Sequence, residues 1–428
     1  NPNNPSEFYV AYASGGLWHT VNNGNTFTPI MDNSDTQNIG DFDIDWSTRL
    51  IIVGTGENNS SRSSYAGVGI LKSNDNGKTW KNIGLNDSHH IGKIVINPNN
   101  PNEIVVAVLG HLYSKNKERG IFKTIDGGVT WENTLYIDES TGIIDLDISP
   151  NNFKIQFASS WQKSRKAWDF KGNGEKSGIY KSVDSGKTWN LISTQKSGFP
   201  TGNGVGRIGL AVFDSKTLYA VVDNQFRRPK SKASTEKTDL SKNYFESISK
   251  ERFLKIEDLK LDKFLTTNSF PKKYNSTKIK ELVKNDLIKP SDLKLYLEDA
   301  NTVMFETPII GAQVYRSDDG GLNWTLKNSY YLDRLYNTYG YYFGKIHVSP
   351  VNKDNIYIYG VPFIKSNDGG VTYKSIDYPN VHVDHHDLWI NPKNPKHLIN
   401  GNDGGVNISY DNGENWLKFN QPSVGQFY

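Results

Sequence analysis

Histidine, carboxylate, arginine and aromatic side chains that could perform chemistry gather in a few segments of this 428-residue chain. Asp384, His385 and His386 are consecutive, as are His89 and His90, and His111 follows in a neighbouring segment. Imidazoles and carboxylates that converge from different segments can coordinate a metal or transfer protons. We interpret these histidines as structural hydrogen-bonding groups and assign no metal site, with a metal site and acid–base chemistry as the alternatives.

Two sets of candidate residues can be named. Glycoside hydrolysis requires two carboxyl groups, and the candidates are Asp41, Glu57, Asp145, Asp384 and Asp403. Ligand binding requires cations, imidazoles or stacking rings, and the candidates are Arg62, His89, His90, His111, Trp161, Arg165, Arg207, Arg227, Tyr341, His385 and His386. For Trp161 and Tyr341, stacking on sugar rings and plain loop packing explain the residue type equally well. For Arg227, binding of a carboxylate is the alternative to a solvated position.

A repeated turn motif identifies the elements that must position these residues. Its frame is Ser/Thr-x-Asp-x-Gly-x-Thr/Asn-aromatic, as in SNDNGKTW (73–80), and TVNNGNTF (20–27) is a degenerate copy. We call this motif the Asp box. Its aspartates are Asp75, Asp126, Asp184, Asp319, Asp368 and Asp411. The Asp accepts hydrogen bonds from nearby backbone N–H groups, and the Gly adopts a φ that other residues resist. We therefore assign these carboxylates a structural role.

Four strands accompany each Asp box. GILKS (69–73) enters the first complete box, and IGKIVINP (91–98) and EIVVAV (103–108) are the two strands that open the next repeat. Four-stranded units that recur roughly every 50 residues are typical of β-propeller blades. We predict an all-β fold over residues 1–428, a seven-bladed β-propeller of four-stranded blades. We expect strand 424–428 to pair with the N-terminal blade, which would close the ring.

One interval between boxes, from Asp184 to Asp319, is much longer than the others. It contains a charged stretch with helix-spaced apolar residues around 253–265, 277–287 and 291–300. The sequence thus predicts a small α-helical insertion in blade 5, over residues 229–305. Its charges suit a solvated surface, and a lid over the channel is the alternative.

The alternating strand direction places the Asp boxes on one face of the propeller and long, dissimilar loops on the other. These loops are GTGENNSSRSSYAG (54–67), GHLYSKNKERG (110–120) and SSWQKSRKAWDFKGNGEKSG (159–178). Variable loops on a rigid scaffold are where binding normally resides. We therefore expect the ligand on the face opposite the Asp boxes.

Composition excludes several functional classes. A net charge of +3 gives no electrostatic case for nucleic acid. The absence of Cys excludes disulfides, thiol catalysis and Cys-ligated zinc. No apolar run approaches the ~20 residues of a transmembrane helix. We expect no cofactor, and the start at Asn1 without a leader indicates a processed form or a fragment.

The Asp boxes resemble those of the bacterial neuraminidase repeat superfamily, which includes sialidases, family-74 xyloglucanases, photosystem II assembly propellers and sortilin-type receptors. The stretches GTGENNSSRSSYAG, SHHIGKIVINP, LGHLYSKNKERGIFKT and VDHHDLWINPKNPKHLINGNDGGVNISYDNG are similar to sortilin-like or glycosyl-hydrolase-like repeat proteins exported by Bacteroidetes. The resemblance implies the N-terminal part of a longer protein that is periplasmic, outer-membrane-associated or secreted.

The resemblance implies an extracytoplasmic propeller that binds a peptide, protein or glycan, with further domains of the chain or an outer-membrane complex as additional partners. The alternative function is a family-74-like glycoside hydrolase that acts on polysaccharide. That family uses two aspartates between two propellers, and Asp41 resembles the first of them in position. A metal-dependent hydrolase built on the histidines is a third hypothesis.

Overall fold

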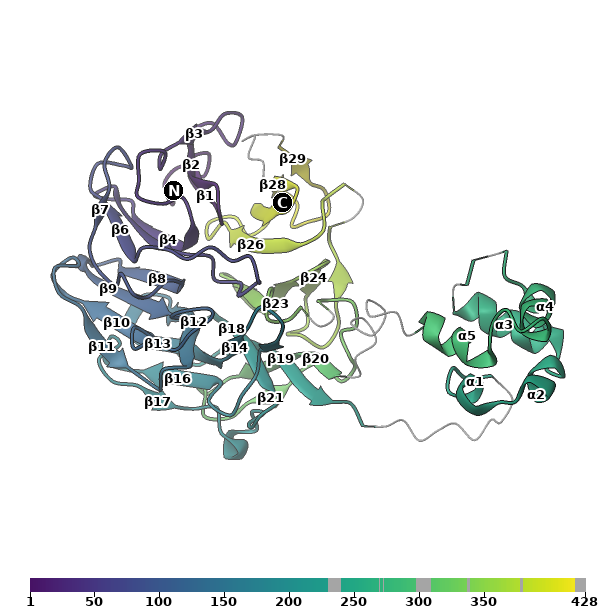
Figure 1. Cartoon of the computed structure of the whole chain (residues 1–428). Coiled ribbons are helices and arrows are strands. Elements are labelled where there is room, and N and C mark those ends of the chain that lie inside the picture. The colour runs from purple at the N-terminus through teal and green to yellow at the C-terminus, as the bar shows by residue number, and fades with distance from the viewer. Residues whose placement is uncertain are drawn as a thin grey trace. The chain divides into compact units, whose positions relative to one another are not determined.

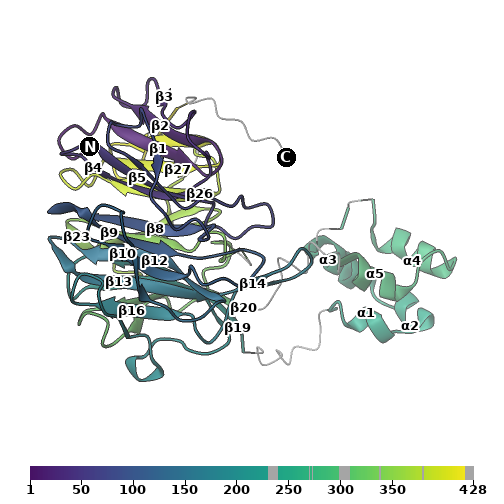
Figure 2. The ribbon, with the colours of Figure 1, turned by 60° about the vertical axis from the view of Figure 1, so that its left-hand side comes forward.

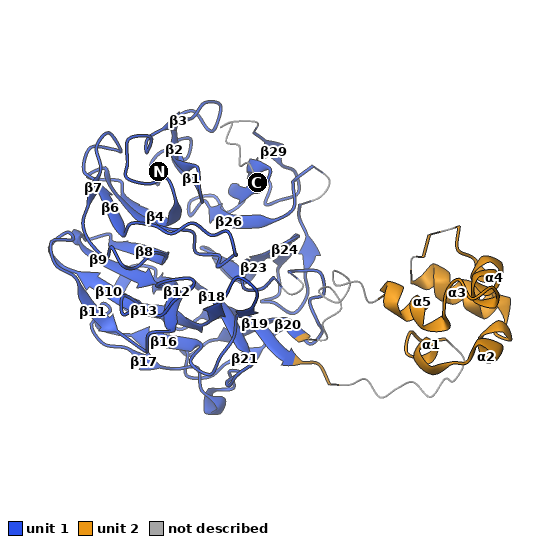
Figure 3. Cartoon of the chain, viewed as in Figure 1, with its two compact units in different colours: residues 1–226, 310–428 blue, residues 227–309 orange. Residues whose placement is uncertain are grey.

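A computed structural model describes residues 1–229, 240–268, 270–271, 273–297, 309–336, 339–377 and 380–419. The chain divides into two compact units (Figure 3). Unit 1 comprises Asn1–Phe226 and Ile310–Tyr428, and unit 2 comprises Arg227–Ile309.

Unit 1 is a seven-bladed β-propeller of antiparallel sheets. Blade 1 contains β1 (Phe8–Tyr12), β2 (Gly16–Thr20) and β3 (Thr28–Pro29). Blade 2 contains β4 (Ile39–Asp45), β5 (Leu50–Thr55), β6 (Ile70–Ser73) and β7 (Lys81–Asn82). Blade 3 contains β8 (Ile91–Asn97), β9 (Asn100–Val108), β10 (Gly120–Thr124) and β11 (Glu132–Leu135). Blade 4 contains β12 (Thr141–Ser149), β13 (Asn152–Gln162), β16 (Gly178–Ser182) and β17 (Asn190–Leu191).

Blades 5 to 7 each have four strands, as blades 2 to 4 do. Blade 5 contains β18 (Val205–Val212), β19 (Leu218–Arg227), β20 (Ile309–Ser317) and β21 (Thr325–Leu326). Blade 6 contains β22 (Lys345–Ser349), β23 (Asn352–Tyr359), β24 (Phe363–Ser366) and β25 (Lys374–Ser375). Blade 7 contains β26 (His385–Ile390), β27 (Leu398–Asn402), β28 (Gly405–Ser409) and β29 (Leu417–Lys418). A short hairpin of β14 (Ser164–Arg165) and β15 (Phe170–Lys171) and a 3₁₀ turn, η1 (Gln195–Ser197), complete the described elements of unit 1.

Within each blade, the strands follow one another in sequence order from the centre of unit 1 to its rim (Figure 1). β4, β8, β12, β18 and β26 lie nearest the middle, and β7, β11, β17, β21 and β29 lie at the edge. The second strand of blade 2, β5, is buried along its whole length, and its sequence LIIVGT is largely apolar. The fourth strands are short and largely exposed to solvent. The predicted propeller and its blade order are confirmed.

The Asp boxes form self-contained turns between the third and fourth strands. In blade 3, Asp126 Oδ1 accepts hydrogen bonds from Thr130 N (3.0 Å) and Thr124 Oγ1 (2.7 Å), and Oδ2 accepts one from Thr130 Oγ1 (2.6 Å). Hydrogen bonds, first that from the Thr130 hydroxyl, hold the pKa of Asp126 well below its usual range. The degenerate box keeps this pattern, since Asn22 Oδ1 accepts a hydrogen bond from Thr26 N (3.0 Å). These side chains are therefore engaged in their own turns.

The box aromatic residue joins one blade to the preceding blade. Trp131 donates its indole N–H to Ile83 O at 2.8 Å, and Trp80 and Trp416 make the same kind of bond to Ile30 O and Ile376 O. Blade 7 and blade 1 meet through a shared apolar cluster that includes Phe8, Val406 and Ile408. The predicted closing strand, 424–428, lies outside the described residues.

Unit 2 is the helical insertion, and it is grouped around its own core (Figure 2). It contains α1 (Tyr244–Ser247), α2 (Lys250–Leu254), α3 (Asp258–Thr267), α4 (Ser276–Lys284) and α5 (Pro290–Leu297). The core consists mainly of Phe245, Phe253, Leu261, Phe264, Ile279, Val283 and Leu293. The segment 253–265 is not one helix, because Glu257 is extended between α2 and α3 and directs Ile256 into this core. None of the described helices has the length and apolar character that crossing a membrane requires.

Candidate ligand-binding face

Two long loops on the face opposite the Asp boxes enclose a pocket rich in cations. The loop 109–119 connects β9 and β10, and the loop 163–177 connects β13 and β16 and contains the β14–β15 hairpin. The pocket has a volume of about 350 Å³ and is lined by Leu112, Tyr113, Ser114, Lys115, Arg119, Ser140, Gln162, Lys163, Ser164, Arg165, Lys171 and Asn173. We call it the cationic pocket, because five of these residues are Lys or Arg and none is a carboxylate.

A second cavity of about 570 Å³ adjoins the cationic pocket, and the two share Lys115, Ser140 and Gln162. Its other lining residues include Asp138, which binds Lys176 Nζ at 2.6 Å. The charges of this second cavity are therefore balanced, whereas those of the cationic pocket are not.

Lys163 is the least compensated charge in the cationic pocket. Its side chain is only 7% exposed, and its Nζ lies 5.7 Å from the centroid of the Trp161 ring. Within the described part of the chain its ammonium group has no carboxylate partner. Burial, reinforced by the nearby charges of Arg119 and Arg165, lowers the pKa of Lys163 to about 7.

Backbone carbonyl groups hold the two arginines of the pocket. Arg119 Nη2 donates to His111 O at 2.7 Å and to Ser114 O at 2.9 Å, while its Nε is buried without a hydrogen-bond partner. Burial lowers the pKa of Arg119 to about 10. Arg165 donates twice to Ser60 O, at 3.0 and 2.7 Å, and its guanidinium carbon lies 3.8 Å from the centroid of the Phe170 ring. Among the described residues, neither guanidinium has an acidic ion-pair partner.

The other predicted binding residues lie in different surroundings. Trp161 is completely buried and donates to Gly172 O at 2.8 Å, and Tyr341 packs on Phe170 with ring centroids 4.6 Å apart. Arg207 is buried and donates to Tyr341 O at 3.0 Å. The exposed arginines are Arg62, whose carbonyl accepts from Tyr113 Oη at 2.6 Å, and Arg227, at the end of β19.

Of the predicted histidines, two are buried and three are accessible. His90 is buried, and its Nδ1 lies 2.7 Å from Glu57 O, while His385 is buried with Nδ1 2.8 Å from Asn400 Oδ1. His386 is accessible and contacts Asp403 at 2.7 Å. His89 and His111 stack on each other with ring centroids 3.6 Å apart. These four sets do not converge on one centre.

Two of the candidate carboxylates tie inner strands together. Asp41 Oδ2 accepts from Ile94 N in β8 at 2.8 Å, and Asp41 Oδ1 contacts Lys93 Nζ at 3.1 Å. Asp145 Oδ2 accepts from Leu210 N in β18 at 2.9 Å. Each therefore links its blade to the next one through the backbone of an inner strand.

Two further aspartates, Asp43 and Asp147, make the same kind of bond and were not among the predicted site residues. Asp43 Oδ2 accepts from Ile96 N at 2.8 Å, and Asp147 Oδ2 accepts from Val212 N at 2.7 Å. Burial raises the pKa of Asp43 to about 6 and that of Asp147 to about 7. The Asp-x-Asp spacing in β4 and β12 is the signal that indicates them, since residues two apart lie on the same face of a strand.

The remaining candidates are Glu57, Asp384 and Asp403. Glu57 is buried and accepts from Tyr65 N at 3.3 Å, and burial raises the pKa of its carboxyl group. Burial, followed by the Asp403 carboxylate, raises the pKa of Asp384. Asp403 is paired with His386. Four of the five candidate carboxylates thus accept hydrogen bonds or form ion pairs within the propeller, an arrangement that does not favour the glycosidase alternative.

Comparison with known proteins identifies the family. The family model Sortilin-Vps10, described as sortilin, neurotensin receptor 3, matches residues 69–304, which is more than half of the chain. The chain belongs to the Sortilin-Vps10 family. It thereby falls within the neuraminidase-repeat and sortilin-like propellers that the Asp boxes resemble. Among curated proteins, none matches the chain.

Solved propeller structures are similar to this family member at low identity. A GH74 enzyme from Niastella koreensis is 16% identical over 97% of this chain and 61% of its own, with a TM-score of 0.37. An ancestral GH74 enzyme is 12% identical over 99% and 54%, with a TM-score of 0.47. YCF48 bound to D1 peptide is 11% identical over 94% and 89%, with a TM-score of 0.49. The chain spans less than two thirds of the two GH74 enzymes.

Proposed function

We propose that the propeller is a ligand-binding module that uses the face opposite the Asp boxes and that its peptide, protein or glycan ligand places an anionic group in the cationic pocket. The uncompensated burial of Lys163 carries the proposal. A buried charge without a partner is unfavourable, and an arriving carboxylate, sulfate or phosphate would relieve that cost.

The two arginines add directionality to the attraction. Arg119 and Arg165 are fixed by the carbonyl groups of His111, Ser114 and Ser60, so little side-chain entropy remains to be lost when a ligand binds. Charge-assisted hydrogen bonds from guanidinium to an oxyanion are stronger than neutral ones. The family description names a receptor, which supports binding over catalysis for this chain as well.

The test uses defined anionic probes. Fluorescein-labelled acidic and neutral peptides of equal length, and polygalacturonate and neutral oligosaccharides, are titrated into the protein by fluorescence anisotropy or calorimetry. We expect an acidic probe to bind the wild type and Lys163→Met to weaken it by about 10- to 150-fold, because a hydrogen bond to a charged group contributes about 1.5–3 kcal/mol. Affinity should also be higher below pH 7 than above it, since Lys163 is protonated there.

Lys154→Met is the matched control, because Lys154 is exposed near the start of β13, at the opposite end of that strand from Lys163. It should bind like the wild type. Failure of every anionic probe to bind, or equal affinities for wild type and Lys163→Met, would contradict the proposal. Whether a peptide or a glycan binds decides between the two ligand classes.

We also propose that the protein acts outside the cytoplasm, in the periplasm, at the outer membrane or after secretion. The support is the resemblance of its loops to those of exported repeat proteins. Fractionation of the source cells with a cytoplasmic marker tests this, and recovery of the protein with that marker would oppose it.

A further inference from the structure

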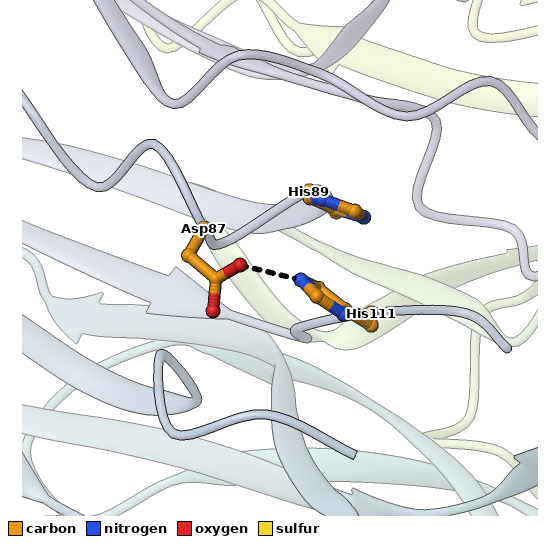
Figure 4. Close-up of side chains that lie close together, drawn as sticks. All are labelled: Asp87, His89 and His111. Carbon is orange, nitrogen blue, oxygen red and sulfur yellow. Dashed lines mark hydrogen bonds and ion pairs between the residues drawn. The ribbon is translucent and has the colours of Figure 1, made fainter. Parts of the chain in front are cut away.

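The side chains of Asp87, His89 and His111 form a cluster near the cationic pocket. The proposed function does not use these side chains. Asp87 and His89 lie between β7 and β8, and His111 lies between β9 and β10. Their ligand atoms all lie within 4.8 Å of one another, and Asp87 Oδ1 is 2.9 Å from His111 Nε2. Figure 4 shows the His89 ring lying over the His111 ring, with the Asp87 carboxylate directed at His111.

Neighbouring groups fix the orientation of the cluster. Ser114 Oγ lies 2.7 Å from His111 Nδ1, which leaves His111 Nε2 for the centre of the cluster. Asn116 Nδ2 donates to Asp87 O at 2.6 Å and contacts Asp87 Oδ2 at 3.3 Å. Metal-binding histidines and carboxylates in proteins are oriented by such secondary hydrogen bonds.

The backbone of His89 has a conformation that needs support from its surroundings. Its φ is 56°, in the left-handed region that few residues other than Gly adopt. His89 O accepts a hydrogen bond from Gly67 N at 2.7 Å, which holds the loop in place. Backbone strain of this kind is common at functional sites.

A second carboxyl group, that of Glu118, lies beside the cluster. Glu118 adjoins Asp87 and His111, and its Oε2 atom is buried without a hydrogen bond. A divalent cation bound by Asp87 and the two imidazoles would compensate the charge of the Asp87 carboxylate.

We infer that Asp87, His89 and His111 bind a divalent transition metal and that Zn²⁺ fits the donor set best. Two imidazole nitrogens and one carboxylate oxygen are typical ligands of zinc, with water at a fourth position. Tetrahedral coordination with bonds of about 2.0–2.2 Å separates ligand atoms by roughly 3.3 Å. The present ligand atoms lie within 4.8 Å of one another, and the stacked His89 and His111 rings must rotate so that their nitrogens point at a common centre.

The binding of Zn²⁺ is measured by calorimetry on the EDTA-treated full chain, and Co²⁺ serves as a spectroscopic probe. We expect one saturable Zn²⁺ site and a visible Co²⁺ spectrum of tetrahedral type. His111→Ala and Asp87→Asn should weaken Zn²⁺ binding by at least roughly 100-fold, because loss of merely supporting groups already costs roughly 10- to 100-fold. Ser114→Ala should weaken it by roughly tenfold.

His382→Ala is the control, since His382 is an exposed histidine outside the cluster. It should leave the Zn²⁺ affinity unchanged. Absence of saturable Zn²⁺ binding by the wild type, or equal binding by wild type and Asp87→Asn, would overturn the inference. If His111→Ala does not fold, Asp87→Asn still decides, because its amide is isosteric with the carboxylate. Binding of the anionic probes by the wild type and by Lys163→Met, measured without Zn²⁺, tests the proposed function separately.

Discussion

Replacement of Asp147 by Asn tests how the inner strands are joined. Asp147 lies in β12, and its carboxylate accepts hydrogen bonds from Val212 N at 2.7 Å and from Ile148 N at 2.8 Å. Burial is the largest cause of a pKa raised to about 7, and the Asp145 carboxylate raises it further. An asparagine retains one oxygen for Val212 N and cannot ionise, so Asp147→Asn isolates the cost of the charge.

Proton linkage gives the direction in which the free energy of unfolding changes with pH. The folded state holds the Asp147 proton up to a pH of about 7, whereas the unfolded chain releases it near the ordinary value of 3.8. The wild type therefore loses free energy of unfolding as the pH rises from about 4 to about 7, and Asp147→Asn does not lose this contribution. The full difference in pKa corresponds to about 4 kcal/mol at 1.36 kcal/mol per unit. Asp147 keeps partial contact with solvent, which screens the charge. We therefore expect the wild type to lose about 1–2 kcal/mol of its free energy of unfolding.

Urea unfolding followed by tryptophan fluorescence measures the effect at several values between pH 5 and pH 8. The free energy of unfolding of Asp147→Asn minus that of the wild type should grow by about 1–2 kcal/mol across this range. Loss of the Ile148 hydrogen bond adds a constant offset, so the slope is the informative quantity. Asp32→Asn, at an exposed position, controls for net charge. A difference that is flat with pH would refute the reasoning.

Two further predictions concern the propeller and its insertion. Trp131→Phe removes the indole donor to Ile83 O and should lower the free energy of unfolding by about 1–2 kcal/mol in urea, whereas Trp168→Phe, at a side chain that is 83% exposed, should be neutral. Replacement of residues 229–308 by a short Gly/Ser linker should leave the melting temperature of the propeller unchanged within a few degrees, because the helices have a separate core; loss of cooperative thermal unfolding would contradict this.

The propeller could be predicted because its signal is local. Each Asp box lies within eight residues, as in Ser73 to Trp80, and depends on side chains that bond their own turn. The blade order, the position of the insertion and the face with long loops followed from counting these boxes. The break between α2 and α3 was not predicted, because it depends on Ile256 reaching the core of unit 2.

The site was harder to predict because its contacts join distant segments. Arg165 is held by the carbonyl group of Ser60, 105 residues away in the sequence, and no local pattern indicates that pairing. Lys163 is adjacent to polar residues and gives no sign in the sequence that it is buried. Asp87 could have been noticed from its spacing to His89, but the stacking on His111 depends on two loops that meet only in the folded chain.

The break in blade 5 between β19 and β20 has an evolutionary consequence. The chain leaves the sheet at the end of β19 and returns to the same sheet in β20, and the two strands remain neighbours. The helical unit is therefore inserted while blade 5 keeps the same strand order as blades 2, 3, 4, 6 and 7. The loops after β9 and β13 connect second and third strands in the same way. These positions can therefore accept inserted sequence while the strand order of the blade is kept.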